Sequence, residues 1–160
     1  MNKEKALTLI FFIIACEVIG SIGSIFTIPN ISTWYAALAK PFFSPPNWLF
    51  APAWGTLFLL MGIALYLVWE SKGKKIVQER KIALSWFTIQ FALNVLWSFL
   101  FFGLRSPFFG FIGIVFLWFS IIITIFSFYK VNKNAAYLLI PYILWVSFAA
   151  ILNYSVMVLN

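Results

Sequence analysis

The chain has 160 residues, of which 64% are hydrophobic, 21% are aromatic and only 9% are charged, and its mean hydropathy is +1.01. Soluble domains carry about 25% charged residues, so this composition excludes an ordinary soluble domain and predicts a surface that faces lipid. The net charge of +7 does not predict nucleic acid as a partner, because the basic residues form short clusters between apolar runs.

Five segments are apolar over the roughly 20 residues that a helix needs to cross a membrane. Backbone polar groups cannot face lipid unpaired, and the sequence lacks the alternation of a membrane barrel. We therefore predict an all-α integral membrane bundle of five helices, in which residues 1–160 form a single domain. The predicted spans are residues 6–27, 48–69, 82–103, 108–129 and 135–158.

The basic residues in the connections predict the orientation of the bundle. The first and third loops hold only Lys40 and Arg105, whereas the N-terminus and the second and fourth loops hold nine basic residues. The positive-inside rule then places the N-terminus in the cytoplasm, and the first loop and the C-terminus outside. The nine residues are Lys3, Lys5, Lys72, Lys74, Lys75, Arg80, Lys81, Lys130 and Lys133.

The first connection, residues 28–47, is long, aromatic and rich in proline. Pro41, Pro45 and Pro46 restrict their own backbone and that of the residues before them, which predicts a stiff loop. Such a loop suits a lid across the mouth of the bundle. Its rings equally suit an aromatic belt at the membrane boundary that binds no ligand.

Polar side chains inside the spans are the first candidates for a functional site. Glu17 is the only acidic residue well inside a span, where a carboxyl group is either functional or a protonated or hydrogen-bonded group that binds neighbouring helices. Gln90, Asn94 and Trp97 share one helix face, because they follow an i, i+4, i+7 spacing. That face either lines a cavity or joins neighbouring helices.

Aromatic stripes provide further candidates. In the second span Trp54 begins a stripe that continues with Phe58 and Met61, a pattern typical of helix packing as well as of a pocket. In the fifth span Trp145, Ala149 and Leu152 share a face, with Asn153 at its edge. Pro141 is expected to loosen that helix near its start.

No conventional catalytic set can be assembled from this sequence. It has no histidine, no pair of carboxylates inside the spans and no glycine-rich phosphate loop, and Cys16 has no adjacent base. The lack of histidine also excludes a histidine-containing zinc or haem-ligand site, and a single cysteine allows no intrachain disulfide. What remains is a cavity rich in indole and phenyl rings, suited to a flat and largely apolar ligand.

Several long motifs resemble the TspO/MBR family, the tryptophan-rich sensory proteins related to the mitochondrial translocator protein or peripheral benzodiazepine receptor. They are GSIGS at 20–24, PNISTWYAALAKPFFSPPNWLFAPAWGTLFLLMGIALYLVW at 29–69, QFALNVLWSFLFFGLRS at 90–106 and LLIPYILWVSFAAILNYSV at 138–156. The resemblance implies five helices around a pocket that is roofed by the first loop, in a homodimer. A prokaryotic plasma membrane is the expected location.

The resemblance also implies a membrane sensor or carrier that binds porphyrin-like tetrapyrroles, with protoporphyrin IX or haem as ligand rather than as required cofactor. Drug-like molecules, membrane lipid and a second copy of the chain are the other implied partners. Alternative functions are a light- and oxygen-dependent degradation of porphyrin at Trp54 and Trp145, or binding and transport of lipid or sterol. Carried over by motif, the ligand-binding residues are Trp34, Trp48, Leu49, Phe50, Trp54, Phe58, Asn94, Trp97, Trp145, Ala149 and Leu152.

The chain departs from the family pattern at several positions. No basic residue follows Tyr154, so cholesterol binding through the sterol motif of the animal proteins is not expected. Phe109 stands where many relatives have a pocket tryptophan, and Gly113 stands where an aspartate is frequent. Glu17 occupies a position where many relatives have a small residue.

Overall fold

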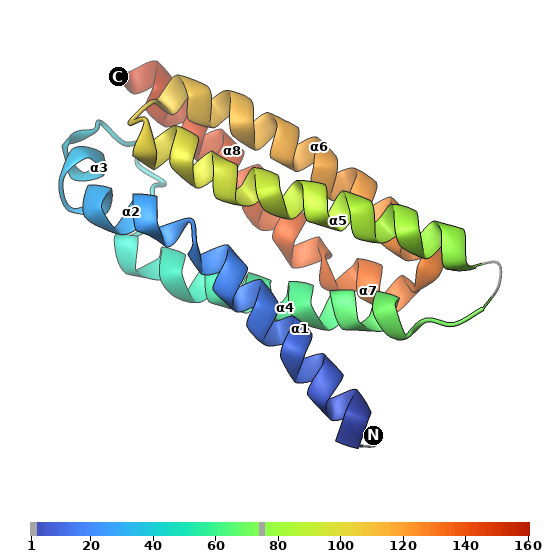
Figure 1. Ribbon diagram of the computed structural model, residues 1–160. Coiled ribbons are helices and arrows are strands. Elements are labelled where there is room, and N and C mark those ends of the chain that lie inside the picture. The colour runs from blue at the N-terminus through green and yellow to red at the C-terminus, as the bar shows by residue number, and fades with distance from the viewer. Residues whose placement is uncertain (1–2, 74–75) are drawn as a thin grey trace.

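The computed structural model describes residues 3–73 and 76–160, and all regular structure in these two ranges is helical (Figure 1). Within these two ranges, four helical stretches are long and apolar enough to cross a membrane, and the bent pair α1–α2 makes a fifth when it is taken as one span. The prediction of an all-α integral membrane bundle is therefore confirmed. The elements are α1 (Lys3–Ser21), α2 (Ser24–Ile31), α3 (Trp34–Ala37), η1 (Asn47–Leu49), α4 (Phe50–Glu70), α5 (Ile76–Ser98), η2 (Phe99–Gly103), α6 (Pro107–Val131), α7 (Lys133–Leu138) and α8 (Ile140–Leu159).

The long helices form a bundle in which α5 packs along α6, α8 packs on α6, and α1 packs on α4. Figure 1 shows α1 crossing α4 obliquely, while α4, α5, α6 and α8 run along one another. The segment between α2 and η1 lies at the same end of the bundle as the C-terminus and the turn from η2 to α6. We call residues 32–46 of this segment the lid and this end of the bundle the lid end.

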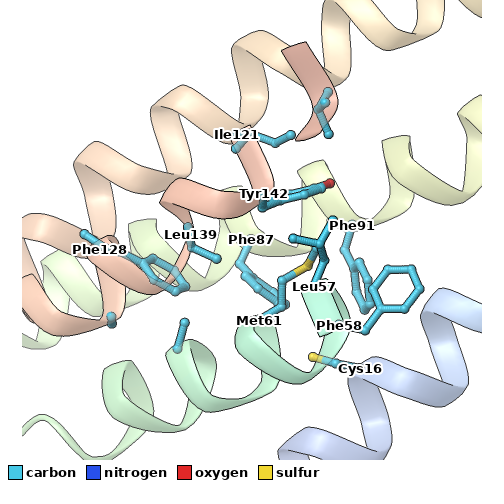
Figure 2. Packing of buried hydrophobic residues seen from close by; sticks show 14 of the residues in the cluster. Cys16, Leu57, Phe58, Met61, Phe87, Phe91, Ile121, Phe128, Leu139 and Tyr142 are labelled. Carbon is cyan, nitrogen blue, oxygen red and sulfur yellow. The ribbon is translucent and has the colours of Figure 1, made fainter. Parts of the chain in front are cut away.

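The core of the bundle is apolar and draws on every long helix. Figure 2 shows Cys16 of α1, Met61 of α4, Phe87 of α5 and Tyr142 of α8 pointing into the same core. Moving an apolar side chain from lipid into the bundle gains little free energy, because lipid tails are equally apolar. The bundle is therefore stabilised by the close packing of these side chains and by hydrogen bonds between helices.

A buried hydrogen-bond network joins α5 to α8 within this core. The Asn94 amide Nδ2 donates to the Tyr142 hydroxyl over 3.0 Å, and that hydroxyl donates to Gln90 Oε1 over 3.0 Å. All three side chains are buried. Gln90 therefore joins helices, which was one of the two interpretations of its polar face, whereas Asn94 also reaches the cavity described below.

The first span is bent by 47° between α1 and α2. At the bend the amides of Ile22 and Ile25 donate to carbonyl groups three residues earlier, as in a 3₁₀ turn, instead of four. The carbonyl groups of Val18 and Ser21 lose their usual partners in this way. The hydroxyls of Ser21 and Ser24 donate to these two carbonyls, so the bend leaves neither of them unpaired in the membrane.

Two prolines mark places where the helices differ from the predicted spans. The first span continues past Pro29 to Ile31, beyond the predicted end at residue 27, and Asn30 Nδ2 donates to the Phe26 carbonyl within it. The fifth span is interrupted between α7 and α8 at Leu139, two residues before Pro141. The expected loosening at Pro141 thus takes the form of a separate short helix.

The turn from η2 to α6 is fixed by a left-handed residue and a helix cap. Arg105 has a φ of 51°, a conformation that few residues other than glycine adopt, and its Nε donates to Asn30 Oδ1 over 3.0 Å. Ser106 caps α6 by accepting from the Phe109 amide, and Pro107 occupies the first turn, where no N–H is required. This turn ties α6 to the first span at the lid end.

Candidate functional site

A cavity of about 350 Å³ lies at the lid end, between the bent first span and the helices α4, α5, η2 and α8. Ligand pockets typically enclose about 300 to 1,000 Å³, so this cavity has the size of a small-molecule site. We call Trp54, Phe58, Trp97 and Phe101 its aromatic wall, and Glu17, Ser21, Ser24 and Thr27 its polar wall. The other lining residues are Gly20, Gly23, Ile28, Ile31, Tyr35, Asn47, Phe50, Ala51, Gly55, Asn94, Ser98, Phe102, Ala149, Leu152, Asn153 and Val156.

The aromatic wall is a row of four rings from α4, α5 and η2, each moderately inclined to the next. Neighbouring ring planes are inclined by 27° between Phe58 and Trp54, 33° between Trp54 and Trp97, and 25° between Trp97 and Phe101. Trp97 is fixed further because its Nε1 donates to Asn153 Oδ1 over 3.2 Å. The row gives the cavity one extended apolar side with a defined direction.

The polar wall offers hydrogen-bond acceptors rather than donors. The hydroxyls of Ser21, Ser24 and Thr27 donate their protons to backbone carbonyl groups of their own span, which leaves oxygen lone pairs for a ligand. When it is ionised, the carboxylate of Glu17 accepts hydrogen bonds and donates none. Among the described residues it forms no hydrogen bond and no ion pair.

Two glycines of the first span allow the cavity walls to meet. A Cβ atom on Gly20 would lie 2.5 Å from ring atoms of Phe58, and a Cβ atom on Gly23 would lie 2.7 Å from the Ser98 hydroxyl. The glycines therefore allow α1 to approach α4, and the bend to approach α5, where a larger residue would not fit. Gly55 differs, because nothing lies within 4 Å of the position of its Cβ.

The lid packs its rings on a π-helical turn at the cavity, and Tyr35 is the lid residue that lines the cavity. In η2 the Leu104 amide donates to the Phe99 carbonyl five residues earlier, and this wider turn directs both Phe101 and Phe102 inward. Tyr35 of the lid packs edge-on against Phe101 and tilted against Phe102, at centroid distances of 6.1 and 5.7 Å. Burial raises the pKa of Tyr35, which therefore stays neutral at physiological pH.

A second set of contacts attaches the lid to the C-terminus. The Ala39 amide donates to Asn160 Oδ1, and Asn160 Nδ2 donates back to the Ala39 carbonyl, both over 3.0 Å. Phe43 packs against Phe148 of α8 at 6.3 Å. The lid is thus held at its start, its middle and its end.

The cavity is open along one side of the bundle. α1 packs on α4, but beyond the bend α2 packs mainly on η2 and α3 instead. Lining residues on both sides of the resulting seam are exposed, namely Ser21 and Ile28 on the first span and Ala51 on α4. Because these helices cross the membrane, the seam faces the lipid.

A model of the TspO/MBR family matches residues 12–159 of the chain. The chain belongs to this family. It is 45% identical to the tryptophan-rich protein TspO of Archaeoglobus fulgidus over 96% of this chain and 97% of that protein. The translocator protein of Homo sapiens is 37% identical over 84% of this chain and 79% of its own length. The tryptophan-rich sensory protein of Cereibacter sphaeroides is 31% identical over 100% and 95%.

Family membership and the apolar helices together show that the chain is an integral membrane protein, and that it is one of the TspO/MBR sensor and translocator proteins. The structure brings most of the residues that the family motifs indicated to one cavity. Those that line it are Phe50, Trp54, Phe58, Asn94, Trp97, Ala149 and Leu152.

Four indicated residues do not line the cavity. Trp34 packs edge-on against Phe101 of η2, with ring centroids 5.4 Å apart, and Trp48 is 71% exposed in the η1 turn. Leu49 lies in the same turn and is half-buried. Trp145 is also half-buried, and it contacts Phe50, which does line the cavity.

Phe50 occupies the space between Trp145 and the open cavity. The two rings meet edge to face at 6.0 Å, and Phe148 packs on Trp145 at 5.8 Å. The Nε1 of Trp145 is buried without a hydrogen-bond partner among the described residues.

The sequence argument missed several lining residues, chiefly Tyr35, Phe101, Phe102 and the serines of the polar wall. The run FLFFG at 99–103 gave no helical periodicity that could assign its rings to a face, because the turn is π-helical. The serines gave no signal either, since their place in the wall depends on the bend of the first span. The position of Asn153 at the edge of a lining face was indicated.

The departures from the family pattern have structural consequences. Phe109, which the family resemblance led us to expect at a pocket position, is 50% exposed and outside the cavity. Gly113, where an aspartate is frequent, lies so close to Leu100 that a Cβ atom would be 2.8 Å from its Cδ1. A carboxylate at residue 113 would therefore require Leu100 to move.

Proposed function

We propose that this TspO/MBR protein binds a flat tetrapyrrole in the cavity and acts as a membrane sensor or carrier for it. The observation that carries the proposal is the row of four rings along one wall, in which neighbouring rings are inclined by 25° to 33°. A flat conjugated ring system can pack against such a row over a large area, and the apolar surface that is buried provides the affinity.

The remaining walls suit a ligand that is apolar in its body and polar at its edges. Ala149, Leu152 and Val156 of α8 contribute small and aliphatic surface opposite the first span. The Oδ1 of Asn94 is available to accept, because its Nδ2 is committed to Tyr142. Pyrrole N–H groups of a porphyrin are donors that such an acceptor can satisfy.

The lining also suits a porphyrin that is held by packing rather than through a metal. Among the described residues that line the cavity there is no Cys or Met, and the sequence has no His, so Tyr35 and Glu17 carry the only side-chain oxygens with the acidity to ligate iron. Both also serve other roles in the wall. We therefore choose metal-free protoporphyrin IX as the probe.

Tryptophan fluorescence tests the proposal directly. Protoporphyrin IX is titrated into the purified protein in a neutral detergent, and quenching is expected because Trp54 and Trp97 lie in the wall that the ligand contacts. Trp54→Phe should weaken the affinity several-fold through lost ring area, and Trp145→Phe less, since Phe50 separates Trp145 from the cavity. Trp86→Phe is the matched control, because Trp86 does not line the cavity.

The competing outcomes are distinct. Equal affinities for the Trp54→Phe and Trp86→Phe variants would remove the aromatic wall from the site. A protein whose cavity holds only co-purified lipid that porphyrin cannot displace, as seen by native mass spectrometry, would instead favour a lipid-binding function. A discrete porphyrin product that forms under illumination only with Trp54 present would favour the degradative function.

We further propose that the lid end faces the outside of a prokaryotic plasma membrane. Lys40 and Arg105 lie at the lid end, whereas Lys5 lies at the far end of the bundle, 3.4 Å from Glu70. Two of the nine basic residues counted from the sequence, Lys74 and Lys75, lie outside the described ranges.

Cysteine labelling in intact cells tests this orientation. Ser32 in the lid and Lys72 at the other end are exposed, whereas the native Cys16 is buried and serves as a silent background. A membrane-impermeant maleimide should label the Ser32→Cys variant in intact cells and the Lys72→Cys variant only after permeabilisation. The reverse pattern would invert the bundle.

A further inference from the structure

The most unusual feature of the cavity is a carboxylate placed halfway along a membrane span. Glu17 is equally distant in sequence from Lys3 and Ile31, the two ends of the bent first span. A charged side chain at the centre of a membrane helix costs about 2.5 to 3.5 kcal/mol. Such a residue is retained only where something in the cavity or the bundle can satisfy it.

Nothing in the described protein satisfies Glu17. Its carboxylate forms no ion pair and no hydrogen bond there, and its neighbours on the polar wall, Ser21 and Ser24, have already given their protons to backbone carbonyl groups. The described lining contains neither Lys nor Arg, and its only other ionisable group is the phenol of Tyr35. This side of the cavity is therefore rich in acceptors and has no positive charge.

We infer that the cavity also binds hydrophobic ammonium ions, with the cationic nitrogen on Glu17 and the serine oxygens and the aromatic body against Trp54 and Phe58. An ammonium group supplies up to three donors and a positive charge, which is the complement of this wall. Glu17, Trp54 and Phe58 border the same cavity, and Gly20 brings α1 into contact with the Phe58 ring. A single amphiphilic molecule can thus contact both walls.

The seam between the first span and α4 provides the route for such a ligand. Glu17 and Ser21 lie on the first-span side of the cavity, where Ser21 is exposed towards the membrane. An amine can cross the hydrocarbon in its neutral form and accept the proton of the neutral Glu17 carboxyl group, which leaves an ammonium ion beside the Glu17 carboxylate. This inference does not depend on tetrapyrrole binding, although both ligands occupy the same cavity.

Three acridines of nearly equal shape separate charge from packing. 9-Aminoacridine is a cation at neutral pH, acridine is largely neutral, and acridine-9-carboxylate carries an added negative group. Each is titrated into the purified full-length protein in a neutral detergent and followed by its own fluorescence. We expect the order of affinity to be 9-aminoacridine, then acridine, then acridine-9-carboxylate.

Substitution of Glu17 then assigns the preference. Glu17→Gln should weaken the affinity for 9-aminoacridine by about 10- to 100-fold, the range expected for a lost charge-assisted hydrogen bond. The affinity for acridine should remain unchanged. Unchanged acridine binding also shows that the variant is folded. Glu79→Gln, which removes the same charge in the first turn of α5 away from the cavity, should change neither affinity.

The results that would overturn the inference are specific. It fails if 9-aminoacridine does not bind, if Glu17→Gln binds it as tightly as the unaltered protein, or if Glu79→Gln weakens it equally. Protoporphyrin quenching is measured on the same samples. If protoporphyrin does not quench the fluorescence but cation binding depends on Glu17, only the proposed tetrapyrrole function is overturned. If protoporphyrin quenches the fluorescence but cation binding does not depend on Glu17, only the cation site is overturned.

Discussion

The contact between α1 and α4 should be sensitive to a single methyl group at Gly62. A Cβ atom added there would lie 2.6 Å from the Cα of Ile13 and 3.0 Å from the carbonyl oxygen of Phe12. Ordinary contact begins at 3.4 Å, so α1 has to move by about 0.8 Å for Gly62→Ala to fit. The obstructing atoms are backbone, which no rotation of a side chain can move.

The expected size follows from two opposing terms. Overpacking of this kind costs about 1 to 3 kcal/mol, and alanine in place of glycine in a helix returns about 0.5 to 1 kcal/mol. Gly55→Ala isolates the second term, because nothing lies within 4 Å of that Cβ position in the same helix. Gly62→Ala should therefore be less stable than Gly55→Ala by about 1 to 3 kcal/mol.

Reversible unfolding in mixed micelles, driven by sodium dodecyl sulfate and followed by circular dichroism, measures both free energies. We expect the midpoint of Gly62→Ala to fall and that of Gly55→Ala to remain or rise. Equal midpoints for the two variants would refute the close backbone approach of α1 to α4. Because α1 carries Glu17, the displaced helix should also weaken 9-aminoacridine in the Gly62→Ala protein.

Two further substitutions test the buried network and the lid. Tyr142→Phe leaves Asn94 Nδ2 and Gln90 Oε1 without their partner. It should lower the free energy of unfolding by about 1 to 2 kcal/mol in the same titration. A loss below a few tenths of a kcal/mol would show that the network makes no net contribution to stability. Asn160→Ala removes both hydrogen bonds to Ala39. Hydrogen exchange of the Ala39 amide, measured by mass spectrometry, should become about tenfold faster. An unchanged exchange rate would show that other contacts hold the lid.

The spans were predictable because the length of an apolar run is set by the thickness of the membrane rather than by tertiary contacts. The end of the first span was placed too early, at residue 27, whereas the helix continues through Pro29 to Ile31. In the structure Asn30 supplies a side-chain hydrogen bond within that turn and accepts a second one from Arg105. Arg105 belongs to a turn that is distant in sequence, so no local pattern around Pro29 could have indicated this contact.

Ring positions were predictable where one regular helix carries them. Trp54 with Phe58, and Asn94 with Trp97, are three or four residues apart on straight helices, so each pair shares a face. The same spacing placed Trp145 with Ala149, and that face does turn inward. Whether Trp145 then reaches the cavity depends on where the η1 turn leaves the Phe50 ring, which spacing along α8 cannot reveal.

The bend in the first span explains both the existence of the cavity and its chemistry. A straight helix would continue along α4 beyond Ser21 and fill the space in front of Trp54. The turn at Ile22 and Gly23 instead carries α2 across to η2, with Gly23 against Ser98. It also frees two carbonyl groups, which engage the protons of Ser21 and Ser24 and leave only their acceptor oxygens beside Glu17. One change in backbone direction therefore opens the site and makes one of its walls selective for donors.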